Sequence, residues 1–214
     1  MTDKEALTLI CLGDSLTAGG PGFSGYGTWS GNIESQYGYW LEKHLEVAFP
    51  EKEIDVLNFG VGGDRLWQIL YRFNRDVLRL VPEPDIVLVM GGVNDILGHG
   101  SHETGVKKDL EEIYDTIYDT EALLVPIEIG PVTATRRFVN RIRKSNKAIR
   151  ELAELFEVPF VPLYDALANK DGFGLNQLYD VGDGVHYNVH GYKKIGEAIF
   201  EVLKPVLEAR FNDS

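Results

Sequence analysis

The sequence predicts a three-layer α/β/α domain, because apolar runs of strand length alternate with amphipathic segments of helix length. The expected strands are nearly continuous apolar runs, which is typical of parallel strands that helices cover on both faces. They span residues 7–12, 55–59, 86–90, 123–129 and 160–163. No interdomain linker interrupts the alternation, so we expect residues 1–214 to form one domain.

Helices are expected at residues 39–49, 64–80, 103–118, 135–156 and 189–210. Pro50 and Pro82 follow the first two, and proline cannot continue a helix. In the fourth, apolar residues at spacings of three, four and seven form a single stripe, made of Phe138, Ile142, Ile149, Leu152 and Leu155. One apolar face is what a helix covering the sheet requires.

The charge of the chain argues against nucleic-acid and membrane partners. Its formal charge is −12, from 21 basic and 33 acidic residues, and such a field repels phosphate backbones and anionic membrane surfaces. The basic residues at positions 136–150 fall on the fourth expected helix, where a solvated face is a better interpretation than a nucleic-acid site. No apolar run has transmembrane length and the first residues do not resemble a signal peptide. We therefore expect no stable membrane insertion and, by default, a cytoplasmic protein.

Metals and cofactors are not expected either. Cys11 is the only cysteine, so neither an intramolecular disulfide nor a thiolate zinc site can form, and a buried packing role is expected for it. A flavodoxin-like cofactor-binding or nucleotide-binding module is the alternative from another class of protein. Residues 60–65 lack the last glycine of a dinucleotide motif, and no Gly-Lys-Ser/Thr sequence is present.

Glycine-rich turns follow the expected strands. In open parallel sheets, ligands bind beyond the carboxyl ends of the strands, so we expect these turns to meet at one edge. Their sequences are Gly13-Asp14-Ser15, Gly60-Val61-Gly62-Gly63-Asp64, Gly91-Gly92-Val93-Asn94-Asp95 and Gly130-Pro131-Val132-Thr133.

Ser15 is the candidate nucleophile for acyl transfer. That chemistry needs a nucleophile, a base, a group that orients the base, and donors for the oxyanion. Ser15 lies at a strand-to-loop turn, although it would equally suit the cap of the next helix. Asp183 and His186 are three residues apart just before the last expected helix, so the carboxylate can hold the imidazole in one tautomer. This pairing favours catalysis over the structural roles that each residue has alone.

Gly63 and Asn94 are candidate donors for the oxyanion. The backbone N–H of Gly63 is accessible to a substrate because glycine allows close approach, although a plain tight turn would also need glycine. Asn94 offers its side-chain amide, although an asparagine after two glycines often only stabilises a turn.

Four sequence blocks resemble those of the SGNH hydrolases, also called the GDSL esterase/lipase family. In order, they are Gly13-Asp14-Ser15-Leu16, Asn58-Phe59-Gly60-Val61-Gly62-Gly63-Asp64, Gly91-Gly92-Val93-Asn94-Asp95 and Asp183-Gly184-Val185-His186. The resemblance implies a flavodoxin-like fold with a five-stranded parallel sheet. It also implies a triad of Ser15, Asp183 and His186, and an oxyanion hole made by Ser15, Gly63 and Asn94.

The implied activity is hydrolysis of small-molecule carboxylic esters through an acyl-enzyme, with short-chain acyl or acetyl esters preferred. A lysophospholipase, a thioesterase or an acyltransferase with the same triad are the alternatives. Two positions depart from the family pattern: Tyr187 stands where proline is frequent, and Arg65 where a small hydroxyl residue is frequent. We expect Arg65 to line the substrate entrance.

Two loops are candidates for the walls of the substrate site. Residues 20–31 form a long glycine-rich loop, and its Phe23, Tyr26 and Trp29 are predicted to form a mobile wall or lid. Simple packing of these aromatic residues on the domain is equally compatible with the sequence. Residues 169–181, which precede Asp183, are the candidate for the opposite wall.

Overall fold

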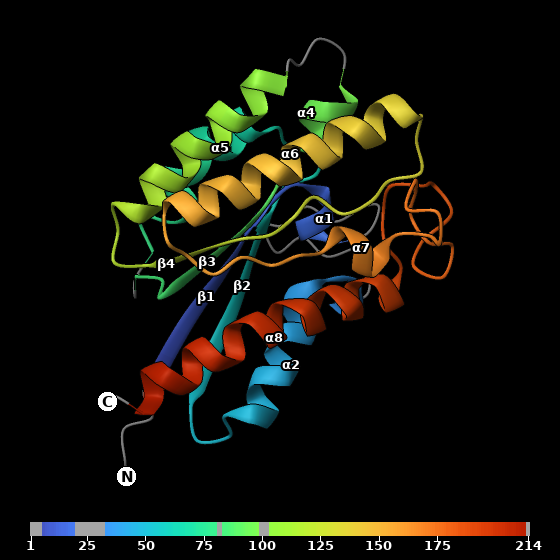
Figure 1. Cartoon of the computed structure of the whole chain (residues 1–214). Coiled ribbons are helices and arrows are strands. Elements are labelled where there is room, and N and C mark those ends of the chain that lie inside the picture. Colours follow the sequence, from blue (N-terminus) through green and yellow to red (C-terminus); the bar gives the residue numbers. More distant parts are fainter. Residues whose placement is uncertain (1–5, 20–32, 81–82, 99–102, 213–214) are drawn as a thin grey trace.

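The computed structural model describes residues 6–19, 33–80, 83–98 and 103–212 of the chain (Figure 1). The described elements are, in order, β1 (Ala6–Gly13), α1 (Ser15–Ala18), η1 (Ile33–Ser35), α2 (Tyr37–Ala48), β2 (Glu53–Gly60), α3 (Leu66–Asp76), β3 (Ile86–Met90), α4 (Val93–Leu97), α5 (Glu103–Tyr118), β4 (Leu123–Pro126), α6 (Arg136–Leu155), α7 (Tyr164–Leu167) and α8 (Val189–Asn212). Strands and helices alternate through most of the chain, as the hydrophobic pattern predicts.

The described strands form one parallel sheet in the order β2-β1-β3-β4. Gly13, at the end of β1, lies level with Gly60 of β2 and with Met90 of β3. The loops that follow these strands therefore leave the sheet side by side. This register positions the first three glycine-rich turns at one edge, as expected for a ligand site in an open parallel sheet.

Helices cover both faces of the sheet, which confirms the three-layer α/β/α prediction (Figure 1). On one side α2 packs against α8, and on the other α5 packs against α3 and α6. Every residue of β3 is buried, and Cys11 in β1 is fully buried as predicted. None of the helices in the described segments is long and apolar enough to span a membrane.

The expected fifth strand is wrong for the described part of the chain. Residues 160–163 form only one parallel bridge, in which the Val161 N–H donates to the Pro126 carbonyl at 2.9 Å and the Val161 carbonyl accepts from the Glu128 N–H at 3.1 Å. Pro159 lies two residues before this bridge and has no N–H with which to extend the ladder, and two residues after it the Leu163 N–H donates to the Glu128 carboxylate instead. The segment takes the place of a fifth strand without forming one.

Several element ends also differ from the prediction, most of all those of β4 and α3. β4 ends at Pro126 rather than at residue 129, because the backbone leaves β3 after Ile127, whose N–H still donates to the Val89 carbonyl at 2.9 Å. There, the Ile129 N–H donates to the Asn146 side chain, and the Glu128 carboxylate accepts from the Leu163 N–H. The helix expected at 64–80 is shorter and begins at Leu66, whose N–H donates to the Asp95 carboxylate at 3.1 Å.

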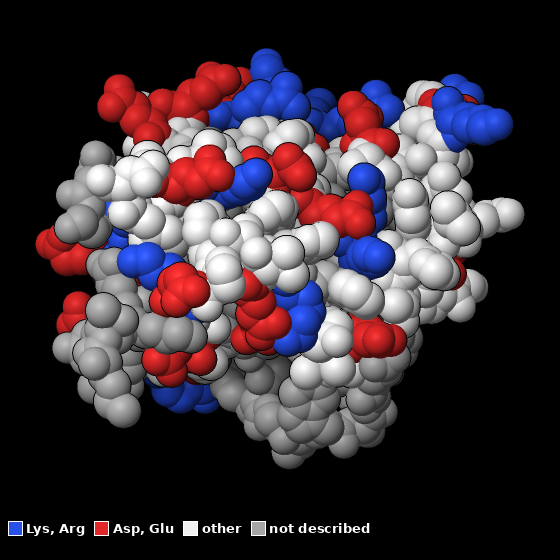
Figure 2. All heavy atoms as spheres, turned by 90° about the horizontal axis from the view of Figure 1, so that it is seen from below, with Lys and Arg blue, Asp and Glu red and all other residues white. Residues whose placement is uncertain are grey.

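Acidic and basic side chains are interspersed on the face seen from below in Figure 2. The basic residues of α6 are exposed apart from Arg141, which is half-buried. Arg141 donates to the Ile96 carbonyl at 2.9 Å, and Arg143 donates to the Gly172 carbonyl at 2.8 Å. The basic side of this helix is thus solvated and partly engaged within the protein.

Candidate active site

Asp14, and not Ser15, caps the short helix α1. The Asp14 Oδ1 accepts a hydrogen bond from the Leu16 N–H at 2.9 Å, which is the pattern of an N-cap residue. Ser15 is the first helical residue and is half-buried. The capping role considered for Ser15 therefore belongs to its neighbour, and the Ser15 hydroxyl is available for other contacts.

Glycine allows α1 to lie directly on the ends of β1 and β2. A Cβ atom at Gly13 would collide with the Thr17 side chain, and one at Gly60 would collide with the Ala18 backbone. Asn58 fixes the contact, because its Nδ2 donates to the Thr17 carbonyl at 2.8 Å while its Oδ1 accepts from the Gly60 N–H at 2.9 Å. Residues from the first two blocks thus hold the Ser15 turn in place.

Ser15, His186 and Asp183 form a continuous chain of hydrogen bonds. The Ser15 Oγ lies 3.1 Å from the His186 Nε2, and the His186 Nδ1 lies 2.7 Å from the Asp183 Oδ2. A carboxylate at Nδ1 favours the tautomer that carries its proton there, which leaves the Nε2 lone pair facing the hydroxyl. This arrangement is suited to the removal of a proton from Ser15.

Hydrogen bonds keep the Asp183 carboxylate ionised. Partial burial raises its pKa, but donation from the His186 N–H, the His186 ring and the Val185 N–H outweighs this effect, so the pKa is lowered overall. The two N–H groups reach the Asp183 Oδ1 at 2.8 and 2.9 Å. One carboxylate oxygen thus shapes the turn while the other holds the imidazole.

The loop that carries this pair is tied to the turn after β4. Gly184 has a φ of +75°, which favours glycine, and its carbonyl accepts from the Thr133 N–H at 2.6 Å. The Asp180 Oδ1 accepts from the N–H groups of Gly182 and Gly184 at 2.7 and 3.0 Å. These contacts position His186 over the sheet edge, and they bring the fourth glycine-containing turn to the site.

Tyr187, the departure from the family pattern beside His186, packs under this loop. Its side chain is fully buried and its ring lies edge-on to Tyr192, with the ring centres 5.7 Å apart. A Cβ atom at position 130 would collide with the Tyr187 phenol oxygen, so Gly130 leaves the room that the phenol needs. The tyrosine is thus accommodated without displacing His186 from Ser15.

The oxyanion candidates follow the two strands that flank β1, with Gly63 on the turn after β2 and Asn94 at the start of α4, after β3. Gly63 is exposed with a φ of +83°, and among the described residues its N–H has no hydrogen-bond partner. The Asn94 Nδ2 donates one hydrogen to the Asp64 carbonyl at 2.9 Å, which leaves the other for a ligand. Together with the N–H of Ser15, these groups can stabilise a negative oxygen.

Arg65 follows the oxyanion turn directly. Its N–H donates to the Gln68 Oε1 at 3.0 Å at the start of α3, and its guanidinium lies against Gly98. Phe23, Tyr26 and Trp29, the other residues predicted to contact substrate, lie outside the described residues. Their proposed lid therefore stays a prediction.

The second predicted wall is only partly apolar. Leu175 is buried, and the Phe173 ring packs under the Arg136 guanidinium at 4.9 Å. Leu178 and Val181 are exposed, and the Val181 N–H donates to the His186 carbonyl at 3.2 Å. One of the residues with an exposed apolar side chain, Val181, is thus bonded through its backbone to the histidine segment.

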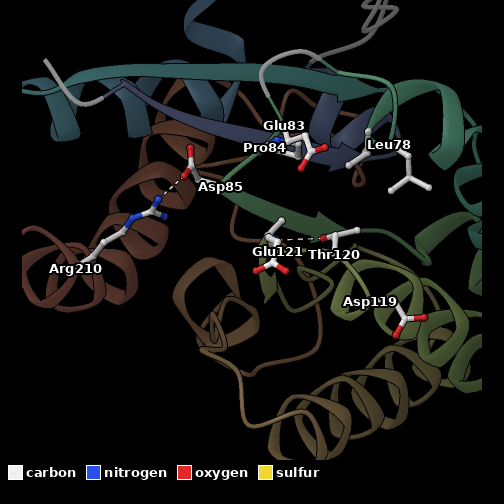
Figure 3. Close-up of a pocket in the computed structure, with 10 residues that line it drawn as sticks. Leu78, Glu83, Pro84, Asp85, Asp119, Thr120, Glu121 and Arg210 are labelled. Atoms are coloured by element: carbon white, nitrogen blue, oxygen red, sulfur yellow. Dashed lines mark hydrogen bonds and ion pairs between the residues drawn. The ribbon is translucent and has the colours of Figure 1, made fainter. Parts of the chain in front are cut away.

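A cavity of about 650 Å³ lies elsewhere, at the amino ends of β3 and β4 (Figure 3). Its lining includes Glu83, Thr120 and Glu121, and the Arg210 guanidinium pairs with the Asp85 carboxylate across it. In a parallel sheet, this edge is opposite the one that carries Ser15. The cavity is therefore separate from the candidate active site. No cluster of three or more metal-binding side chains occurs in the described segments.

Sequence reasoning missed Arg72, which binds the turns that carry the candidate site. A detectable signal was present, because Arg72 and Asp76 lie on the buried face of α3 together with Leu66, Ile69 and Phe73. Charged residues on an otherwise apolar stripe indicate a buried ion pair.

The parallel α/β/α fold, with a serine, a histidine and an aspartate joined at one sheet edge, is typical of hydrolases. The chain matches the GDSL-like Lipase/Acylhydrolase family over residues 11–194 and belongs to that family. This confirms the resemblance seen in the four sequence blocks.

Relatives and solved structures of similar architecture span most of the chain. Human platelet-activating factor acetylhydrolase IB subunit alpha2 is 25% identical over 210 residues, which cover 96% of this chain and 80% of the relative. The acetylxylan esterase Axe2 from Geobacillus stearothermophilus is 20% identical, with a TM-score of 0.78 and coverage of 95% and 96%. The lipase/acylhydrolase from Enterococcus faecalis is 23% identical, with a TM-score of 0.72 and coverage of 93% and 96%.

Proposed function

We propose that this chain is a serine esterase that hydrolyses carboxylic esters through an acyl-enzyme on Ser15. The observation that carries the proposal is the continuous contact from the Ser15 Oγ through His186 to Asp183. A serine that only caps a helix, or that lies on the surface, does not require a histidine and an aspartate bonded in series to its hydroxyl. Membership of the acylhydrolase family supports the same chemistry.

In the proposed reaction, the His186 Nε2 takes the hydroxyl proton as the Ser15 Oγ attacks the ester carbonyl carbon. The carbonyl oxygen becomes negative and is stabilised by the N–H groups of Ser15 and Gly63 and by the Asn94 amide. The bond to the alcohol then breaks, and His186 protonates the leaving oxygen. Asp183 stabilises the imidazolium that exists between the two proton transfers.

Water completes the cycle. His186 removes a proton from a water molecule, which attacks the acyl carbon and forms a second tetrahedral intermediate. Its collapse releases the carboxylic acid and returns the proton to the Ser15 Oγ.

Short acyl groups, acetyl above all, are the proposed substrates. The names of relatives of two kinds, an acetylhydrolase and an acetylxylan esterase, both refer to acetyl groups. The exposed Leu178 and Val181 offer an apolar surface next to the histidine segment. Arg65, just after the oxyanion turn, and the aromatic residues Phe23, Tyr26 and Trp29 are proposed to contact the ester as well.

A panel of p-nitrophenyl acetate, butyrate and octanoate tests the proposal. We expect acetate to react fastest, and Ser15→Ala to reduce every rate to background while its thermal unfolding stays unchanged. Rapid quenching should give an acetylated peptide that contains Ser15. Wild-type rates in Ser15→Ala, or no hydrolysis of any ester, would refute the proposal. Added methanol distinguishes an acyltransferase, which would form methyl acetate in preference to acetic acid.

A further inference from the structure

Arg72 on α3 is a buried cation that bonds to three different parts of the structure. Its side chain is only 7% exposed. Its Nε donates to the Asp64 Oδ2 at 2.6 Å, its Nη1 to the Asp76 Oδ2 at 2.5 Å, and its Nη2 to the Gly13 carbonyl at 2.8 Å. The planar guanidinium fixes the directions of these bonds, so the three acceptors are held in one geometry.

The bond to Gly13 acts on the Ser15 turn. Gly13 is the last residue of β1, two positions before Ser15, and its carbonyl also accepts from the Val61 N–H at 3.0 Å. Val61 begins the turn that carries Gly63. The same carbonyl thus joins the serine turn, the glycine turn and the Arg72 guanidinium.

The bond to Asp64 acts on the oxyanion candidates. Asp64 follows Gly63 directly, so a fixed Asp64 carboxylate restrains the left-handed Gly63 backbone next to it. The Asp64 carbonyl accepts from the Asn94 Nδ2, and this contact sets the direction of the second Asn94 N–H. Ser15, Gly63 and Asn94 are therefore linked to Arg72 within one or two contacts.

Stability alone is a weak reason for such a group. The free energy needed to remove an arginine and two carboxylates from water offsets much of the attraction between them. Apolar side chains can therefore often replace a buried ion pair without lowering the stability of the fold. Oxyanion donors, in contrast, must be held close to their working geometry, because displacement by about 1 Å can lower a rate about a hundredfold.

We propose that Arg72 is a positioning residue of the oxyanion hole, which holds the Ser15 and Gly63 turns together and orients the Asn94 amide through Asp64. The inference rests on the proposed esterase function. Arg72 acts through its neighbours and does not touch the substrate.

The test compares Arg72→Lys with wild type on p-nitrophenyl acetate. Lysine keeps the charge but cannot reach three acceptors in fixed directions. We expect kcat to fall about tenfold to a hundredfold with KM within about twofold, because the donors act on the transition state. The affinity for a trifluoromethyl ketone, which forms an anionic adduct with a reactive serine, should fall in parallel with kcat.

Arg75→Lys is the matched control. Arg75 lies on the same helix and binds the other oxygen of Asp76 at 2.6 Å, but from a position that is 62% exposed. We expect its kcat to stay within about twofold of wild type. A double-variant cycle adds specificity: Arg72→Lys should cost less in an Asn94→Ala background than in wild type, because part of its effect passes through Asn94.

An unchanged kcat in folded Arg72→Lys, or fully additive effects with Asn94→Ala, would overturn the positioning role. If Arg72→Lys does not fold, Asp64→Asn decides the question, since it weakens one bond while the Asp64 carbonyl remains. A normal kcat in that variant would also overturn the proposal. Failure of the esterase function itself is recognised separately, because wild-type protein would then hydrolyse no ester or Ser15→Ala would remain active.

Discussion

Asp14 is expected to make the stability of this protein fall as the pH rises. The carboxyl is only 1% exposed. Burial raises its pKa from 3.8 to about 7, with a smaller contribution from the nearby carboxylates of Asp95 and Asp64, against the opposing effects of the Leu16 N–H and Arg72. Among the described residues its Oδ2 has no hydrogen-bond partner. The folded state therefore favours the protonated form.

The sign and size of the effect follow from the difference between the pKa of Asp14 in the folded state and its pKa in the unfolded state. Between the unfolded value near 3.8 and the folded value near 7, only the folded state holds the proton, so raising the pH favours unfolding. Each pH unit in this range lowers the free energy of unfolding by about 1.4 kcal/mol, which amounts to a loss on the order of 4 kcal/mol over the whole interval. The contribution of the protonated Asp14 carboxyl to stability is fully present below pH 4 and is lost above about pH 7.

Asp14→Asn isolates this contribution, because asparagine keeps the oxygen that accepts from the Leu16 N–H but cannot ionise. Urea unfolding of wild type and variant is followed by circular dichroism from pH 4.5 to 8.5. The free energy of unfolding of the variant, relative to that of wild type, should rise by about 3 kcal/mol from the lowest to the highest pH. Asp115→Asn, at an exposed position on α5, controls for the loss of a charge. Parallel stability curves for Asp14→Asn and wild type would refute the reasoning.

Other predictions concern the site and the core. Gly130→Ala should destabilise the fold by about 1–3 kcal/mol through collision with the Tyr187 hydroxyl. Adding Tyr187→Phe should restore the urea midpoint, and a double variant no more stable than the single one would contradict this. Asn94→Ala should lower kcat about a hundredfold with little change in KM, and an unchanged kcat would exclude its amide from the oxyanion hole. Asp183→Asn should lower kcat at least about a hundredfold without moving the urea midpoint, because its side chain is 43% exposed; unfolding of the variant would argue against an orienting role. Cys11 should resist thiol reagents in the native protein, because it is fully buried and burial raises its pKa to about 12. Labelling as fast in buffer as in urea would contradict its burial.

Much of the architecture was predictable because local signals and packing agree. The helix expected at residues 103–118 was found with the same bounds, and the strand at residues 86–90 as well. The fifth strand failed because an apolar run shows burial but does not show whether its N–H groups can form a ladder. Pro159 and the bond from the Leu163 N–H to the Glu128 carboxylate decide that question here, and the second of these cannot be seen in the sequence.

The candidate site was predictable in composition but not in its supporting contacts. Ser15 and His186 are 171 residues apart in the chain, and only the four ordered blocks suggested that they meet. The apolar stripe of α3 indicates a buried ion pair at Arg72 and Asp76, but the bond from Arg72 to the Gly13 carbonyl was not predictable, because main-chain acceptors leave no signal in a sequence. Tyr187 appeared as a departure from a pattern, while the space for it is provided by Gly130, which lies on a distant turn.

The ion pair between Asp85 and Arg210 has a practical consequence for handling the protein. The Asp85 Oδ2 also accepts from the Thr8 N–H at 2.8 Å, so this carboxylate joins the starts of β1 and β3 to the last turn of α8. The first strand thus begins, and the last helix ends, on the side of the sheet opposite Ser15 (Figure 1). An affinity handle or a surface linker inserted just before β1 or just after α8 is therefore carried on that side, and an immobilised sample presents the edge that carries Ser15 to the solution.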